Sequence, residues 1–380
     1  VVFDDYDGEI PNVGQPVDPA LASTGFVPVS QLESGGFDAL DIIVRSSATS
    51  TSDQGVPTPD TPDSLPIIEF PVDLELDLAR SVTLDGAILR TTGDATVNIS
   101  SAYVAMGYSD ERVPLDGSIP DKTSADNPQD TNIPIRLTPL AGGGRLTIDG
   151  QLVELVGEAV TEGFGDTAAD TTGFSITASE EIRVRGVRKF LSNEYGGLFR
   201  TAGQLALDSP RVYPTTLTDF ELSVEGIGGR VDISGTPAQA APLSVGGRLE
   251  LNAANIVQGG ALLAPLGKLQ FNADDSLVFA SGSLTSTSPF GVSAPFFRTE
   301  PGGALILPAQ SGSQDQLVFV ETITNEEFER QLPTQLIDAV APAIDLQPGS
   351  QFDLSGGGDI RAYEFVPGPG GSQDILLATH

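Results

Sequence analysis

Residues 246–284 read GGRLELNAANIVQGGALLAPLGKLQFNADDSLVFASGSL, and they state one phrase twice, as GRLELNA and then, twenty residues later, as GKLQFNA. Both copies keep the small and the apolar positions and exchange the polar ones. In each copy apolar residues alternate with polar ones, which is the period of a short β-strand that buries one face. Such a strand needs neighbours on its buried face, so its repetition indicates a repeated β-structure.

The phrase returns along most of the chain. Each copy is a short alternation that ends in Asp, Asn, Ser or Thr, followed by a small residue, and none reads as a helix. The irregular spacing suits coils of roughly 15 to 30 residues with loops of different length. The copies lie at Val82–Gly86, Val97–Ser101, Gly144–Gly150, Gly173–Ala178, Gly203–Ser209, Gly229–Gly235, Gly247–Ala253, Gly267–Ala273 and Gln351–Gly356.

Two all-β arrangements compete for these strands. If each phrase stacks on the previous one as a parallel ladder about 4.8 Å apart, the apolar positions line one interior and the outward positions are free to vary. An antiparallel sandwich instead needs hairpins with Asn-Gly or Asp-Gly turns. Asp85-Gly86 and Asp149-Gly150 stand at the ends of repeats, not between paired strands. We therefore predict a parallel β-helix (solenoid) with long loops and one short helix.

Polar residues close many of the strands, and two roles remain open for them. They either stack as side-chain ladders between coils or serve only as turn formers. These residues are Asp85, Asp149, Asp208, Asn252 and Asn272.

Shifts in composition along the chain predict four parts. Residues 1–32 form an acidic segment that caps the stack or contacts another subunit. Residues 33–320 form the β-helix, with Pro-, Ser- and Asp-rich loop insertions at 46–66 and 109–133. Residues 321–348 form a loop with one short helix near Asn325–Leu332, which Asn325 caps and Pro333 follows. Residues 349–380 supply the final coil and a tail.

Charge and composition exclude several classes of function. The chain has 380 residues, with 19 Lys and Arg against 52 Asp and Glu, a net charge of −33 that repels nucleic acid and anionic membranes. No apolar run approaches the roughly 18 residues that span a bilayer, and no secretion signal opens the chain. We therefore expect that a signal was removed or that the chain is part of a longer one.

The residue types also argue against an enzyme. The chain has no Cys and a single His, His380, so Ser-His-Asp and Cys-His nucleophile systems and His/Cys zinc sites are excluded. Paired acids that cleave polysaccharides remain as an alternative, with Asp274-Asp275 and Glu180-Glu181 as examples. Acidic pairs are expected by chance in so acidic a chain, so we predict that the protein is not an enzyme.

Two charged stretches are candidate sites. FDDYDGE places Asp4, Asp5, Asp7 and Glu9 beside a glycine, a set of oxygen ligands suited to calcium, although Pro16 stands where an EF-hand needs Glu. A solvated acidic terminus is the alternative, and no other cofactor is expected. The residues of the basic run at 183–189, RVRGVRK, either face solvent on a strand edge or pair with acids on the neighbouring coil; docking to an acidic surface of the next subunit is the alternative.

Several longer segments resemble the C-terminal region of filamentous-haemagglutinin-family exoproteins of the two-partner secretion type. They are VYPTTLTDFEL (212–222), LNAANIVQGGALLAPLGKLQFNA (251–273), GSLTSTS (282–288) and SGGGDIRAYEFVPGPGGSQDIL (355–376), with ESGGFDALDI (33–42), LARSVTLDGAIL (78–89) and SSAYVAMG (100–107) upstream. The resemblance covers most of the chain. It implies a right-handed parallel β-helix that a dedicated outer-membrane pore secretes.

The function expected from these observations is structural. The resemblance implies an extracellular protein of the bacterial cell surface, an adhesin or a biofilm matrix fibre, without the N-terminal secretion domain of longer relatives. A stack with open ends predicts head-to-tail self-assembly into a filament. The alternative is a β-helix that binds or cleaves host or matrix polysaccharide with surface carboxylates.

Overall fold

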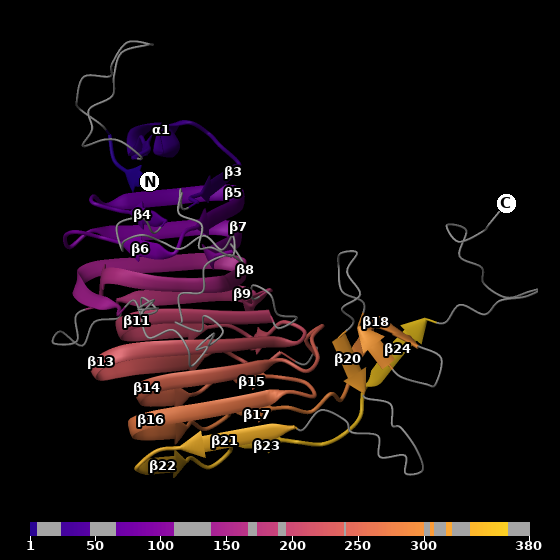
Figure 1. Ribbon diagram of the computed structural model, residues 1–380. Coiled ribbons are helices and arrows are strands. Elements are labelled where there is room, and N and C mark those ends of the chain that lie inside the picture. Colours follow the sequence, from indigo (N-terminus) through magenta and orange to yellow (C-terminus); the bar gives the residue numbers. More distant parts are fainter. Residues whose placement is uncertain are drawn as a thin grey trace, which may run out of the picture.

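The computed structural model describes residues 1–5, 24–45, 66–109, 138–165, 173–188, 195–238, 241–299, 305–307, 317–320 and 335–363. In these residues the chain winds as a stack of β-strands from the N-terminal end to the C-terminal end (Figure 1). Strands on successive coils pair in parallel, as in Arg248 to Lys268 and Val97 to Leu146. The prediction of an all-β parallel solenoid is confirmed.

Long strands bend around a corner of the coil and thereby contribute to two of its three faces. The bends coincide with shifts in register, for example between Leu78 and Ser81 and between Ala253 and Asn255. The long strands are β5 (Leu74–Asp85), β7 (Thr96–Tyr108), β8 (Leu140–Phe164), β9 (Phe174–Arg185), β11 (Tyr195–Asp208), β13 (Thr218–Ser234), β14 (Arg248–Gln258) and β16 (Lys268–Phe279).

Short strands complete the coils. They are β3 (Ala39–Ile43), β4 (Ile67–Glu69), β6 (Ile88–Arg90), β12 (Val212–Pro214), β15 (Ala261–Leu263), β17 (Leu284–Ser286), β21 (Leu336–Val340), β22 (Ala343–Leu346) and β23 (Gln351–Asp353). One more short strand, β10 (Val187–Arg188), pairs antiparallel with β11.

The two copies GRLELNA (247–253) and GKLQFNA (267–273) lie on top of one another. Each residue from Arg248 to Ala253 pairs with the residue twenty positions later, from Lys268 to Ala273, so twenty residues make one coil here. Leu251 and Phe271 both point inward and are fully buried. The apolar positions are kept because they form one interior column, and the polar positions vary because they face outward.

The nine copies do not form a single column, which corrects the expectation that each phrase stacks on the previous one. Five copies stack in succession, through Val97, Leu146, Phe174, Leu205 and Val231. Val231 then pairs with Ile256, not with the Leu249 of the next copy. The copies thus occupy different faces of the coil, because any strand with one buried face fits any of the three.

Of the two roles left open for the corner residues, a ladder is confirmed for the asparagines. Asn272 Nδ2 donates a hydrogen bond to Asn252 Oδ1 at 2.9 Å and a second to Glu250 Oε1 at 3.0 Å. Asp85 instead accepts a hydrogen bond from the backbone amide of Ser109 and forms a 2.8 Å ion pair with Arg45.

The N-terminal end of the stack is partly covered, although Phe37 and Ile43 are exposed there and β3 pairs only with β5 among the described strands. Strands β1 (Val2–Phe3) and β2 (Phe26–Val27) pair in parallel, and Phe3 stacks on Phe70 with ring centroids 5.0 Å apart. Helix α1 (Val29–Ser34) follows Pro28, and its Val29 and Leu32 are buried against the core. α1 lies over the end of the stack (Figure 1). Part of the predicted 1–32 arm is therefore a coil of the stack itself.

Two predicted boundaries are wrong at the C-terminal side. Residues 336–346, assigned to a loop, form β21 and β22, which pair in parallel with β16. Strands β18 (Ser293–Thr299), β19 (Leu305–Leu307) and β20 (Leu317–Val320), assigned to the β-helix, instead form a separate sheet with β24 (Asp359–Tyr363) beside the stack (Figure 1). The predicted helix at 325–332 lies outside the described residues, as do the loop insertions apart from Pro66 and Ser109.

Candidate functional site: the open C-terminal coil

The predicted calcium ligands are only partly described. Asp4 and Asp5 belong to the first coil, and Asp5 Oδ1 accepts a hydrogen bond from Ser30 Oγ at 3.0 Å; Asp7 and Glu9 lie outside the described residues. Within the described ranges, no three His, Cys, Asp or Glu side chains are grouped to hold a metal. Calcium binding at this terminus therefore stays a prediction.

The first part of the basic run lies at the end of β9, where Arg183 and Arg185 are paired with acids, as one of the interpretations predicted. Val187 and Arg188 form β10, and Lys189 lies outside the described residues. The Arg183 guanidinium contacts Glu181, and its Nε donates to the Tyr213 hydroxyl at 2.8 Å. Arg185 Nε lies 3.2 Å from Glu154 Oε2 on the neighbouring coil. Glu154 and Glu181 are buried, so their charges are held by arginines across successive coils.

Two tyrosines complete this cluster. The Tyr103 hydroxyl donates to Glu154 Oε2 at 2.8 Å, and Tyr213 lies under Arg183 in a cation–π contact of 5.9 Å. Burial, with the carboxylate of Glu154 beside the hydroxyl, raises the pKa of Tyr103 to about 12. Burial likewise raises the pKa of Tyr213 to about 12. Every carboxylate in the cluster already has a cationic partner, so the arrangement joins coils and leaves no acid–base pair free for catalysis.

Of the other acidic pairs proposed for polysaccharide cleavage, Asp274 and Asp275 are exposed at the bend of β16. No helix in the described part of the chain is long and apolar enough to cross a bilayer.

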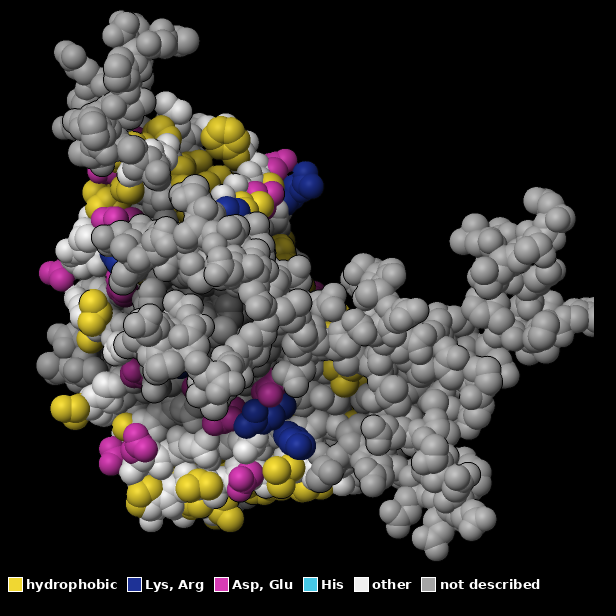
Figure 2. All heavy atoms as spheres, viewed as in Figure 1, with side chains coloured by type: hydrophobic (Ala, Val, Ile, Leu, Met, Phe, Trp, Pro, Cys, Tyr) yellow, Lys and Arg dark blue, Asp and Glu magenta, His cyan; other side chains and the backbone are white. Residues whose placement is uncertain are grey.

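The last coil, formed by β21, β22 and β23, exposes side chains that point toward the interior. Ile344 continues the column of Leu277, and Leu346 continues the column of Phe279. Leu277 and Phe279 are at most 1% exposed, whereas Ile344 is 46% and Leu346 59% exposed. These residues have the pattern of a core with its next layer missing. Figure 2 shows hydrophobic side chains along this end, where Figure 1 places β21 and β22.

Other apolar side chains extend the same surface. Phe352 on β23 is 41% exposed and contacts Phe279 edge to face, with ring centroids 4.8 Å apart. Leu336 and Val340 face outward and are exposed, although the residues one coil earlier in their columns are Lys268 and Asn272. The end coil is thus apolar at positions where the preceding coil is polar.

The backbone of this coil is paired on one side only within the described residues. β21 and β22 pair with β16, and β23 pairs with β17, and no described strand pairs with their opposite edges. Such edges present free N–H and C=O groups to another strand. The apolar side chains and the free edge together make the C-terminal coil the candidate functional site.

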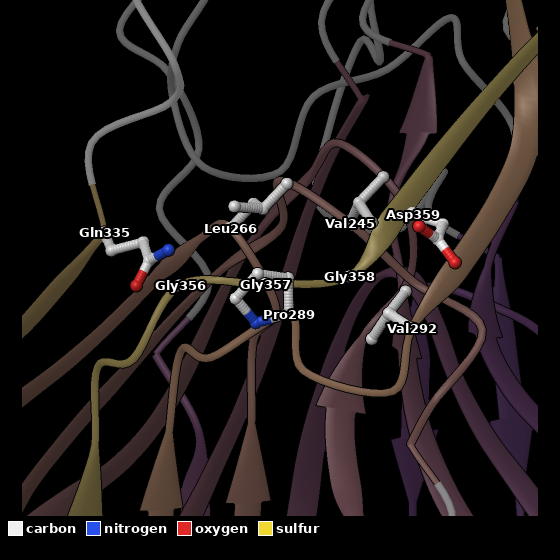
Figure 3. Close-up of a pocket in the computed structure, with 9 residues that line it drawn as sticks. All are labelled: Val245, Leu266, Pro289, Val292, Gln335, Gly356, Gly357, Gly358 and Asp359. Carbon is white, nitrogen blue, oxygen red and sulfur yellow. The ribbon is translucent and has the colours of Figure 1, made fainter.

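A small hollow lies where the chain leaves this coil for the side sheet. It has a volume of about 270 Å³, and Gly356 to Gly358 run along it between Gln335 and Asp359 (Figure 3). Val245, Leu266, Pro289 and Val292 supply its apolar wall. The charged and amide groups lie at opposite ends of the hollow, so they do not converge on one reacting atom.

No family model matches the chain, and neither a curated protein nor a solved structure matches it. The class of the molecule therefore follows from its geometry. The described residues define a parallel β-solenoid with one end partly covered by α1 and one open end.

The sequence carries a signal for the strands of the open coil. LIDAV and AIDL carry the same alternation as the other strands, but they lack the glycine and the final small residue of the repeated phrase. Searching for alternation alone would have found both strands. The exposure of the side chains on these two strands could not be predicted from the sequence, because it depends on whether another layer follows them in space.

Proposed function

We propose that the chain is the rod of a secreted structural or adhesive protein at the bacterial cell surface, and that the rod is joined end to end through its C-terminal coil. The observation that carries the proposal is the exposure of inward-pointing Ile344, Leu346 and Phe352 in a coil with a free strand edge. A parallel stack is stiff along its axis and offers a joint only at its ends. The proposed function is therefore mechanical: the chain serves as a stiff element that is joined at its end.

Secretion, surface location and the partners named by the sequence belong to the same proposal. The motifs that resemble filamentous-haemagglutinin exoproteins support passage through an outer-membrane pore and a place in a surface fibre or biofilm matrix. The net charge of −33 supports a hydrated rod that does not associate side by side with other rods, since their like-charged sides repel each other. Host or matrix polysaccharide is a further partner that adhesion would imply.

The partly covered N-terminal end changes the expected mode of joining. Head-to-tail filaments would set the open coil of one copy against α1 of the next, so α1 would have to leave the stack. Two copies that meet by their open coils need no such change. The joint between copies is therefore expected to be tail to tail, and long filaments require displacement of α1.

Imaging of the purified chain tests the proposal. High ionic strength screens the acidic ends, so we expect rods joined in pairs by one end at high salt and single rods at low salt. The variant Ile344→Lys/Leu346→Lys should give single rods in both conditions. Ile227→Lys is the matched control, because Ile227 is 95% exposed at a bend of β13 away from the end coil.

Negative-stain microscopy and light scattering give the readout. Single rods at every salt concentration would contradict the proposed joint, and so would loss of pairing in the Ile227→Lys control. Compact particles without a long axis would contradict the rod itself.

The polysaccharide-cleaving alternative has less support, because the buried carboxylates of β8 and β9 are held by arginines. Incubation with acidic and neutral polysaccharides, followed by assays for new reducing ends and unsaturated products, separates the two functions. Detection of either product would favour polysaccharide cleavage over the structural function.

A further inference from the structure

We infer that the preferred occupant of the C-terminal coil is an extended strand of a second polypeptide in which apolar residues alternate with Lys or Arg. The inference rests on the proposed function, since it takes this coil as the joint of the rod, but it names a basic strand and not a second copy as the occupant preferred at low salt. It adds the chemistry that selects the partner.

The backbone of the coil is suited to strand addition. β21 and β22 leave their outer edges unpaired among the described residues, and an added strand would satisfy those N–H and C=O groups. Exposed edges in soluble proteins are commonly protected by charged side chains, lysine above all, or by proline within the strand. β21 and β22 contain neither lysine nor proline, each carries a single aspartate, and Pro342 lies in the corner between them.

The apolar half of the partner's pattern follows from the inward columns. Among the described residues no further layer follows Ile344, Leu346 and Phe352, whereas their columns continue elsewhere in the stack. In every earlier coil of these columns an inward side chain covers the one before it, as Leu277 covers Ile256. An added strand must therefore carry an apolar residue at every second position.

The basic half follows from the outward columns. On the preceding coils the acids have cationic or amide neighbours: Arg248 Nη1 lies 3.0 Å from Asp219, and the Arg248 guanidinium also contacts Glu250. At the end coil Asp338 and Asp345 face outward and are exposed; Asp345 Oδ2 accepts a hydrogen bond from Gln347 Nε2 at 3.4 Å, and Asp338 pairs in register with Gln270. Residues 335–359 contain no Lys or Arg. A strand with cations opposite these two aspartates continues the pairing that the stack already uses.

Charge also separates this partner from a second copy. The end coils of two copies would bring Asp338 and Asp345 of one toward those of the other. A head-to-tail contact would also bring like charges together, because the N-terminal end exposes Asp38 and Asp41. Both chains carry a net charge of −33, so copies repel at low salt whereas a basic strand is attracted.

Two labelled peptides of equal length test the inference by fluorescence anisotropy with the full chain at low ionic strength. One alternates Lys with Ile, Val and Leu, and the other has Glu in place of every Lys. We expect the lysine peptide to bind at least about tenfold more tightly than the glutamate peptide, as two charge contacts of roughly threefold each would give. Hydrogen exchange should show new protection of amides in residues 336–346.

Charge reversal of the protein gives the decisive control, because any polycation is attracted to so acidic a chain. Asp338→Lys/Asp345→Lys should lose about tenfold affinity for the lysine peptide and gain affinity for the glutamate peptide. Asp77→Lys changes an equally exposed aspartate on β5, far along the stack, and should bind as the wild type does. Circular dichroism checks that each variant is folded.

The outcomes decide between occupants. Equal loss in Asp77→Lys and in Asp338→Lys/Asp345→Lys would show general charge attraction and overturn the inference, and so would failure of both peptides to bind. Copies that associate at low salt and exclude the lysine peptide would make a second copy the occupant. Rods that pair at high salt while the lysine peptide fails to bind would leave the proposed joint standing without this partner.

Discussion

The exposure of the last coil makes a quantitative prediction about one column of isoleucines. Ile256 and Ile344 occupy the same inward column with Leu277 between them, yet Ile256 is fully buried and Ile344 is 46% exposed. Replacing each by alanine removes the same atoms from the same kind of position. The difference between the two variants therefore measures whether a further layer covers the end.

The expected magnitudes follow from burial. Ile256→Ala removes three carbons from a closed core and leaves a cavity, which costs about 3 kcal/mol and falls within the range of about 2 to 5 for such changes. Ile344→Ala loses only the part of the transfer free energy that its half-burial provides, and solvent fills the space. We expect about 1 kcal/mol for that variant.

Urea denaturation followed by circular dichroism gives the free energy of unfolding of both variants against the wild type. A loss for Ile344→Ala as large as that for Ile256→Ala would refute the reasoning, because it would mean that the end is covered in solution. Addition of the lysine peptide should reduce the difference in unfolding free energy between the two variants, since a bound strand would bury Ile344.

Three further predictions concern the sides of the stack. Asn272→Asp removes the donor to Asn252 and Glu250 and places a carboxylate beside Glu250, so we expect a loss of about 1 to 2 kcal/mol in urea denaturation, with a larger loss at low salt. Gly107→Ala should cost at least about 2 kcal/mol, because Gly107 has φ 129° and a Cβ there would lie 2.0 Å from the Val156 carbonyl oxygen, whereas Gly93→Ala meets no atom and should be neutral in the same assay. Tyr103 and Tyr213 have folded-state pKa values of about 12 against an ordinary value of 10, so the folded state holds their protons more tightly. Their contribution is present below pH 10 and is lost as the pH rises from 10 to about 12; Tyr213→Phe should weaken this alkaline loss of stability, and an unchanged profile would contradict the assignment.

How far the sequence predicted the site can be judged from three groups of residues. Arg183 and Arg185 were predicted to pair with acids on the neighbouring coil as one of the options, and the pairing with Glu154 confirms it. The asparagine ladder was likewise one of two open roles. The open coil was not predicted, because its strands at 336–346 fall in the segment 321–348, for which the sequence predicted a loop with one short helix.

The sequence by itself determined the strands and the direction of their side chains. Period-two alternation decides which residues must be buried, and a phrase repeated at twenty residues decides that Leu251 and Phe271 lie in one column. These are local properties, and each phrase carries them on its own.

Only the tertiary structure decided which face each phrase occupies and how the stack ends. Val231 pairs with Ile256 and not with Leu249, because corner positions set the faces and the phrase fits all three. α1 covers part of one end through Val29 and Leu32, whereas Ile344 and Leu346 remain exposed at the other. Burial at an end depends on what lies beyond it in space, and no alternation within a strand records that.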